Sequence, residues 1–270
     1  MDLQDVLLVS IGLFVGFIGT LIGAGGGFIL VPILLLIFPA LEPEQVTSIS
    51  LAIVFFNACS GSFAYAKMKR IDYKTAVLFA AATIPGAIMG AWFTSFIARR
   101  AFDLLLGAIL ILIAVFLLAK PHFSKKETKA GGRGYVSRSV TDNKGTQYQY
   151  SFNKWLGIAI SFVVGYLSSL LGIGGGIIHV PALTSLLNFP IHIATATSHL
   201  ILAIMALAGT MVHIIQGNLE GQWLAVLYTG VGVIVGAQGG AYFSHRAKPG
   251  WIIRALAFAL LLVGIRIVFM

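Results

Sequence analysis

Charged residues are scarce in this chain of 270 residues, and their scarcity decides its class. Only 10% of the residues are Asp, Glu, Lys or Arg, whereas 58% are hydrophobic and the mean hydropathy is +0.95. Residues 6–38, 46–66, 75–98 and 155–219 contain none of these four residue types. A spanning helix needs about 20 mainly apolar residues. The sequence therefore excludes an ordinary soluble domain and predicts an all-α, polytopic membrane protein.

Cysteine and acidic residues are also few. The single cysteine, Cys59, lies inside an uncharged run, so no internal disulfide and no Cys-rich metal site can form. The chain has 9 acidic against 18 basic residues, and eight of the basic residues fall within residues 120–154. Basic loops stay in the cytoplasm. The excess of positive charge therefore indicates topology rather than nucleic-acid binding, and we predict a cytoplasmic basic linker over residues 120–154.

Glycine is abundant, and it forms a motif that occurs twice. Gly23–Pro32 and Gly172–Pro181 share the pattern Gly-x-Gly-Gly-Gly-x-x-x-x-Pro, 149 residues apart. An ungapped alignment of residues 16–32 with residues 165–181 has nine identities in 17 positions. Chance does not supply five matching glycines there. The sequence therefore predicts a duplication, with a first transmembrane repeat over residues 1–119 and a second over residues 155–270.

Equivalent loops of the two repeats carry opposite charge. Residues 67–74 hold four Lys or Arg, whereas residues 217–222 hold none and one acid, Glu220. The positive-inside rule places the first loop in the cytoplasm and the second outside, so we predict inverted repeats. A parallel arrangement fits worse, because it places the loop of Glu220 inside. Inverted repeats do leave Arg99 and Arg100 outside, against the rule.

Inversion requires an odd number of membrane crossings in each half. Three uncharged segments of each half predict three transmembrane helices. The glycine-broken segment that precedes them must then cross zero times, as a re-entrant hairpin, or twice, as a short helix pair. The 11 residues after the first glycine run would reach about 17 Å as a helix, roughly half of the hydrocarbon thickness.

The glycine motifs favour an anion site. Three consecutive glycines allow backbone conformations that other residues resist, and broken backbone survives at membrane depth only beside protein or a water-lined cavity. A helix that resumes near Phe28 or Ile177 presents free N–H groups and the positive end of its dipole, which suit an anion. The alternative is close helix packing alone. Paired, symmetric interruptions favour the site, because they mark the substrate sites of transporters.

These residues carry a family resemblance. The doubled glycine pattern, the Thr and Ser residues that follow it and the basic loop between the halves resemble the TauE/SafE family over nearly the whole chain. The resemblance implies a permease of the cell membrane for small sulfur-containing anions such as sulfite and organosulfonates, working by alternating access. Export and proton coupling are likewise implications of the resemblance, and the individual anion is left open.

Polar residues within the uncharged segments complete the predicted site. The matched Thr and Ser clusters near residues 47–50 and 195–198, and two lone amides, can donate hydrogen bonds to sulfonate oxygens. The alternative is ordinary hydrogen bonding between helices, worth about 0.6 kcal/mol each. We expect substrate binding by Gly25, Gly26, Gly27, Gly174, Gly175, Gly176, Thr47, Ser48, Ser50, Asn57, Thr195, Thr197, Ser198, His199 and Gln238.

His199 is the predicted proton-coupling residue. It is the only titratable side chain beside a duplicated polar cluster, in segments that contain no acid. An imidazole changes its charge near neutral pH, so it can bind a proton together with an anion. The alternatives are a structural hydrogen bond to a backbone carbonyl and a proton carried by the substrate itself.

Two other function classes remain open at this point. An intramembrane hydrolase could pair Ser198 or Ser60 with His199 or His213, but the sequence has no Gly-x-Ser-x-Gly elbow and no His-Glu-x-x-His motif. We therefore predict no enzyme. An anion channel would share the central site and lack alternating access. We expect a small anion and the lipid bilayer as partners, no nucleic acid, no metal and no cofactor; a homodimer is left open.

Overall fold

The computed structural model describes residues 3–119, 134–244 and 249–269. Its elements follow the two predicted halves. The first half contains α1 (Leu3–Ile22), α2 (Gly27–Ile37), α3 (Pro43–Lys67), α4 (Tyr73–Thr94) and α5 (Arg99–Ala119). The second contains α6 (Lys154–Leu171), α7 (Gly176–Ser185), α8 (Ile191–Ile215), α9 (Trp223–Phe243) and α10 (Pro249–Val268). The antiparallel strands β1 (Tyr135–Thr141) and β2 (Gln147–Asn153) lie between the halves.

Helix length and outward-facing apolar residues confirm an all-α polytopic membrane protein. Within the described residues, seven helices are long and apolar enough to cross a membrane: α1, α3, α4, α5, α6, α8 and α9. Their outer faces expose large apolar side chains, among them Phe96, Leu112 and Leu224. Such faces belong in lipid rather than in water. The glycine-broken segments supply the shorter apolar helices α2 and α7.

Two helix pairs, α1 with α9 and α4 with α6, pack at backbone distance. A Cβ added to Gly16 would lie 2.5 Å from the carbonyl oxygen of Val233, and one added to Gly90 would lie 2.2 Å from that of Tyr166. Glycine therefore lets the backbones touch, as small residues do in membrane helix pairs. In each pair the first helix of one half packs against the fourth helix of the other half.

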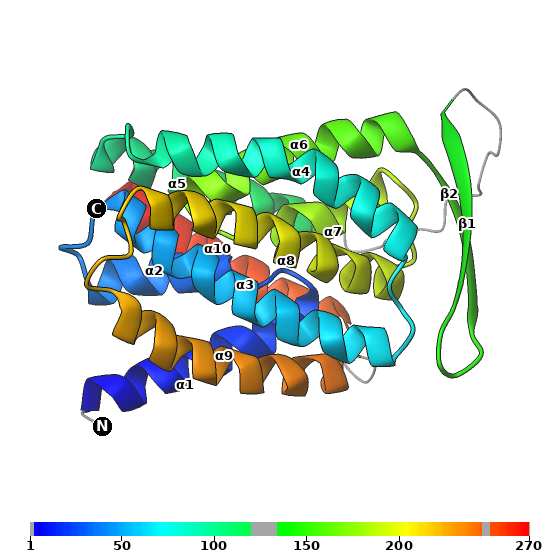
Figure 1. The fold of residues 1–270 in the computed structure, drawn as a ribbon, viewed down its shortest axis with the longest axis horizontal. Coiled ribbons are helices and arrows are strands. Elements are labelled where there is room, and N and C mark those ends of the chain that lie inside the picture. Colours follow the sequence, from blue (N-terminus) through cyan, green and yellow to red (C-terminus); the bar gives the residue numbers. More distant parts are fainter. Residues whose placement is uncertain (1–2, 120–133, 245–248, 270) are drawn as a thin grey trace.

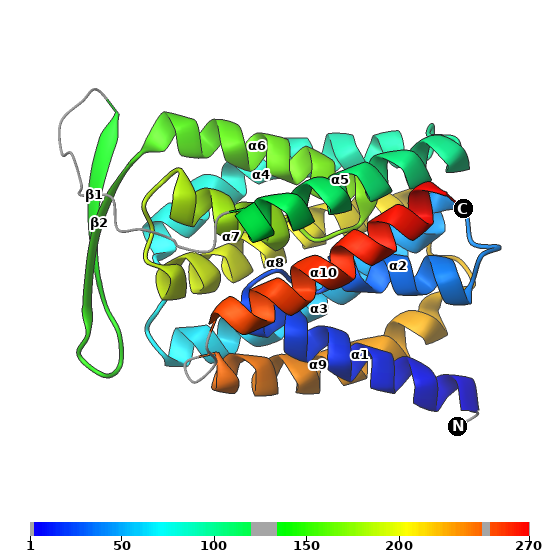
Figure 2. The same ribbon diagram turned by 180° about the vertical axis from the view of Figure 1, so that it is seen from behind.

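Each glycine-broken segment enters and leaves at the same end of the bundle. Figures 1 and 2 show that α2 returns toward the end at which α1 begins, and that α7 returns toward the start of α6. This is the re-entrant form of the two predicted alternatives. The loops 68–72 and 216–222 lie at opposite ends of the bundle (Figure 1), which is the arrangement that inverted halves require.

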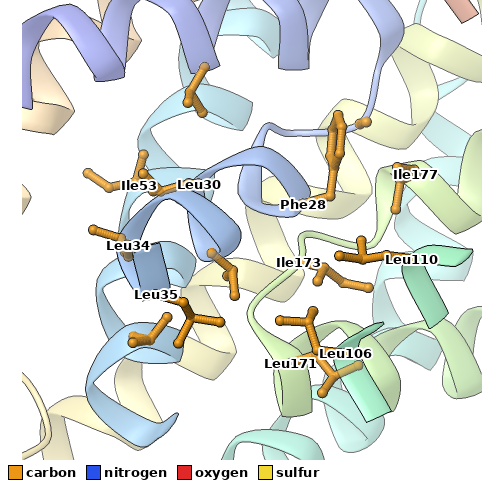
Figure 3. Close-up of a cluster of buried hydrophobic side chains, with 14 of the residues drawn as sticks. Phe28, Leu30, Leu34, Leu35, Ile53, Leu106, Leu110, Leu171, Ile173 and Ile177 are labelled. Atoms are coloured by element: carbon orange, nitrogen blue, oxygen red, sulfur yellow. The ribbon is translucent and has the colours of Figure 1, made fainter. Parts of the chain in front are cut away.

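The short helix α2 is surrounded by protein. Figure 3 shows its side chains Phe28, Leu34 and Leu35 in one buried cluster with Ile173 and Ile177 of the second half. Because neighbouring helices cover it, α2 can begin and end inside the bundle without exposing its free backbone groups to lipid.

The β-hairpin was not predicted from the sequence, which indicated only a hydrophilic linker with turns. The turn expected near residues 141–145 is present, since the N–H of Gly145 donates to the carbonyl of Asp142. Residues 120–133 of the linker lie outside the described residues. The hairpin docks through Tyr150 and Phe152, whose rings lie 4.4 and 5.0 Å from that of Phe189 between centroids. Burial of these two aromatic side chains holds the hairpin against the helix bundle.

Candidate functional site

The two glycine loops, residues 23–26 and residues 172–175, meet inside the bundle. A Cβ on Gly27 would lie 2.5 Å from the carbonyl oxygen of Gly172, and one on Gly176 would lie 2.2 Å from that of Gly23. Positive φ angles occur at Gly23, Gly25, Gly26, Gly172 and Gly174, from 68° to 86°. Backbone conformation and close approach therefore both require glycine here. Close packing, the alternative weighed from the sequence, explains part of the motif.

The loops lie between α3 and α8, and equivalent residues of these helices contact them. A Cβ on Gly25 would lie 3.3 Å from Val54 and 3.2 Å from Leu202, which are equivalent positions of the two halves. Thr195 touches Gly23, and Thr47 touches Gly172 in the same way. The hydroxyl of Ser50 donates to the carbonyl of Gly172 at 2.6 Å. The structure thus brings the predicted glycines together with Thr47, Ser50 and Thr195.

Three predicted residues make contacts elsewhere. Ser48 donates to the carbonyls of Gln45 and Asn218, toward the loop 216–222. The hydroxyl of Thr197 accepts from the N–H of Asp72 at 3.1 Å. Gln238 lies on the exposed face of α9, where it donates to the carbonyl and hydroxyl of Ser60 at 2.8 Å.

A buried polar cluster of Thr20, Asn57, Tyr65 and His199 lies beside the start of α2. The hydroxyl of Thr20 donates to Oδ1 of Asn57 at 2.7 Å, and the hydroxyl of Tyr65 donates to the carbonyl of Thr20 at 2.8 Å. Nε2 of His199 lies 3.3 Å from the Thr20 hydroxyl, and the imidazole is edge-on to the Tyr65 ring. The cluster therefore joins α1, α3 and α8.

Two atoms of this cluster have no hydrogen-bond partner among the described residues: Nδ2 of Asn57 and Nδ1 of His199. Both side chains are fully buried. Nδ2 of Asn57 lies 3.5 Å from the position of a Cβ on Gly26, the residue that precedes α2. Because the hydroxyl of Thr20 donates to Asn57, it accepts from Nε2–H of His199, which leaves the lone pair on Nδ1. Nδ1 is therefore the atom that a proton would join.

The second half does not repeat this cluster. The repeat alignment places Ser169, Met205, His213 and Leu51 at the positions equivalent to Thr20, Asn57, Tyr65 and His199. The hydroxyl of Ser169 is buried without a partner among the described residues, and the sulfur of Met205 lies 3.4 Å from a Cβ position on Gly175. The site is thus polar beside α2 and mainly apolar beside α7.

Thr20 and Tyr65 were not among the predicted site residues. Thr20 aligns with Ser169 just before the glycine motifs, and these matched hydroxyls were a signal in the sequence. The other buried histidines lie apart from the cluster. His179 contacts the hydroxyl of Ser161 at 3.2 Å, and His213 contacts the amide of Asn218 at 3.0 Å. Among the described residues no group of three or more His, Cys, Asp or Glu could hold a metal ion.

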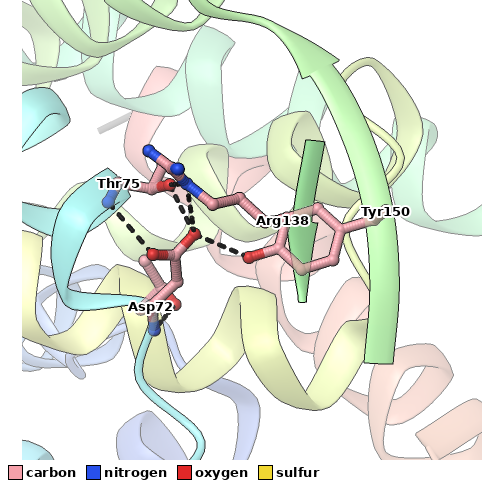
Figure 4. A network of polar contacts seen from close by, with 5 residues as sticks. Asp72, Thr75, Arg138 and Tyr150 are labelled. Carbon is pink, nitrogen blue, oxygen red and sulfur yellow. Dashed lines mark hydrogen bonds and ion pairs between the residues drawn. The ribbon is translucent and has the colours of Figure 1, made fainter. Parts of the chain in front are cut away.

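A second polar network lies where the hairpin meets the helices (Figure 4). The buried carboxylate of Asp72 accepts from the N–H and hydroxyl of Thr75 and from the hydroxyl of Tyr150 at 2.8 Å. Nε of Arg138 lies 3.6 Å from the same carboxylate. Burial, and then the charge of Asp72, raise the pKa of Tyr150, so it donates as a neutral hydroxyl. Asp72 thereby joins both strands to the start of α4, and its N–H joins Thr197 of α8.

Comparison with known proteins gives matches over nearly the whole chain. The family model described as "Sulfite exporter TauE/SafE" matches residues 8–267. "Probable membrane transporter protein YunE" of Bacillus subtilis is 33% identical over 270 residues, which cover 98% of this chain and 97% of that protein. "Probable membrane transporter protein MJ0441" of Methanocaldococcus jannaschii is 27% identical over 230 residues, covering 83% and 78%. No solved structure matches the chain.

Proposed function

Because this chain belongs to the sulfite exporter TauE/SafE family, we propose that it is a secondary transporter of small sulfur-containing anions such as sulfite or organosulfonates. Its relatives are named as membrane transporters, and the chain is itself a multi-pass membrane transporter rather than an enzyme. The intramembrane hydrolase considered from the sequence is therefore set aside. The choice of anion, export from the cell and proton coupling are the proposed parts.

One observation carries the proposed site: unpartnered, fully buried Asn57 Nδ2 beside the first residue of a half-length helix. An amide donor without a partner costs about 1–3 kcal/mol when it is buried. A bound oxyanion would remove this cost, since its oxygens accept hydrogen bonds from Asn57 and from the free N–H groups at the start of α2. The segments around the glycine loops contain no acid that would repel it.

We further propose that residues 1–119 and 155–270 are inverted repeats and that the hairpin end faces the cytoplasm. Lys67, Lys69, Arg70 and Lys74 lie in or beside the loop at that end, whereas Glu220 lies in the loop at the other. The protein would then alternate between states that open the glycine loops to either side. Impermeant thiol reagents should label cysteines placed at positions 69 and 218 from opposite faces of the membrane. Labelling from one face would contradict the inversion.

Proton coupling is assigned to Nδ1 of His199. The imidazole is hydrogen-bonded to Thr20, which in turn holds Asn57, so protonation and anion binding act on one connected group. A positive imidazolium beside the anion would stabilise both bound species. An anion channel could use the same site; flux against an anion gradient, driven by a proton gradient, distinguishes the transporter from the channel.

The test is a flux screen in proteoliposomes with sulfite, sulfate, thiosulfate, sulfoacetate and small carboxylates. We expect saturable, proton-dependent flux of the sulfur anions. Asn57→Leu should reduce it at least tenfold, because a donor that contacts charge contributes about 1.5–3 kcal/mol. Gln238→Leu is the matched control, since it removes an amide on the exposed face of α9. Normal flux in the Asn57 variant would refute the proposed site.

A further inference from the structure

The hairpin end contains a second feature suited to an anion, a cleft of about 690 Å³ between strand β1 and the loop that joins α3 to α4. Three basic side chains line it: Lys69, Lys74 and Arg138. Hydroxyl groups of Ser137, Ser139 and other residues add hydrogen-bond donors. Asp72 is the one acid among the residues that line the cleft.

The positive charge of the cleft is not neutralised from within. Asp72 is already occupied, since it accepts hydrogen bonds from Thr75 and Tyr150 and pairs with Nε of Arg138. Figure 4 shows the outer nitrogens of Arg138 pointing away from this carboxylate. Neither Lys69 nor Lys74 forms an ion pair in the part of the chain that the structure describes. The lysines keep their charges for a ligand.

The cleft lies over the predicted path to the glycine loops. The N–H of Asp72, on its wall, donates to the hydroxyl of Thr197 on α8. Two residues before Thr197, Thr195 touches Gly23; two residues after it, His199 belongs to the polar cluster. Less than two turns of one helix therefore join the wall of the cleft to the proposed binding site.

We infer that this cleft binds a small oxyanion, a sulfite-, sulfonate- or phosphate-type group, and serves as a capture site for the transported anion. The inference rests on the proposed function. A cleft lined by one sign of charge raises the local concentration of its counter-ion and the rate of its association. Capture therefore acts at low anion concentration and leaves the maximal rate to the central site. An anionic lipid headgroup has the same chemistry and is the competing source of the ligand.

The experiment compares two double variants in vesicles of neutral phosphatidylcholine, with sulfite on the hairpin side. Lys69→Gln with Lys74→Gln removes the two free charges of the cleft. Lys67→Gln with Lys144→Gln is the matched control, because neither residue lines the cleft and Lys67 lies over the ring of Phe63. We expect the cleft variant to raise KM about three- to tenfold, to keep kcat within twofold and to lose much of the salt dependence of kcat/KM. The control should change none of these.

Three outcomes would overturn the inference. KM could stay unchanged in the cleft variant. Both double variants could shift KM equally, which would show a general surface effect. The cleft variant could also differ from wild type only in vesicles that contain phosphatidylglycerol, which would assign the cleft to a lipid headgroup. Asn57→Leu in the same vesicles tests the proposed function separately, because it removes flux without altering the cleft.

Discussion

Tyr150→Phe tests how the hairpin is held to the helices. The substitution removes the hydroxyl that donates to Asp72 at 2.8 Å and leaves the ring, which packs against Phe189 and Phe152. The hairpin should therefore stay docked on its aromatic contacts and lose one hydrogen bond to a buried carboxylate. Nothing else in the surroundings of residue 150 needs to move.

The expected magnitude follows from the partners that Asp72 keeps. A hydrogen bond to a charged group contributes about 1.5–3 kcal/mol. Asp72 is not left without partners, since Thr75 and Arg138 still contact it, so the lower end of this range applies. About 1.5 kcal/mol corresponds to roughly a tenfold rise in the population of the undocked hairpin. Tyr148→Phe is the matched control, because its hydroxyl lies 3.5 Å from Asp142, at the limit of a hydrogen bond.

Amide hydrogen exchange of residues 135–153 measures this population directly. Protection of the hairpin amides should fall about tenfold in the Tyr150 variant, while the amides of α3 and α8 keep theirs. The Tyr148 variant should exchange like the wild type. Protection within twofold of wild type in the Tyr150 variant would refute the reasoning, and so would equal losses in both variants.

Three further predictions concern the loops, the proton and the linker. Gly27→Ala should lower stability in detergent by about 1–3 kcal/mol in thermal unfolding, because its Cβ would lie 2.5 Å from the carbonyl oxygen of Gly172. His199→Gln should still bind sulfite in calorimetry but lose the dependence of flux on the proton gradient; unchanged dependence would place the proton on the substrate. Burial raises the pKa of Asp142, but hydrogen bonds from two backbone N–H groups and the charge of Arg70 lower it further, so the net shift is downward. The hairpin turn is therefore fully stabilised above the ordinary carboxyl pKa and loses this contribution as pH falls through the lowered value; Asp142→Asn should remove that pH dependence from hydrogen exchange.

The glycine motifs could be read from the sequence because they encode backbone requirements. A positive φ at Gly25 or Gly174 and contact between two main chains both select glycine at a fixed position, so the duplication preserves the pattern. The contacts of Thr47 and Thr195 followed from the same alignment. These features depend on short stretches of chain, and the sequence therefore predicted both loops and the helices that flank them.

The polar cluster and the hairpin depend on tertiary contacts. Thr20, Asn57 and His199 come from three helices, and their meeting depends on how those helices rotate and cross. The rotation of α9 likewise turns Gln238 toward the outside, which spacing along the chain did not show. Asp72 resembled an ordinary loop charge in the sequence, and it is buried because the hairpin covers it. The strands of the hairpin are short, so their alternation was hidden among polar residues.

The pairing of α1 with α9 and of α4 with α6 has a consequence for the origin of the molecule. A polypeptide of one repeat would leave the glycine faces of its first and fourth helices uncovered, because each is matched only by a helix of the other repeat. A single-repeat ancestor would thus have been stable only as an entwined pair of identical chains, inserted in opposite orientations if the repeats are inverted. Gene fusion through a linker made that pairing permanent and freed each copy to diverge. The split between a polar pole beside α2 and an apolar pole beside α7 is what such divergence leaves behind.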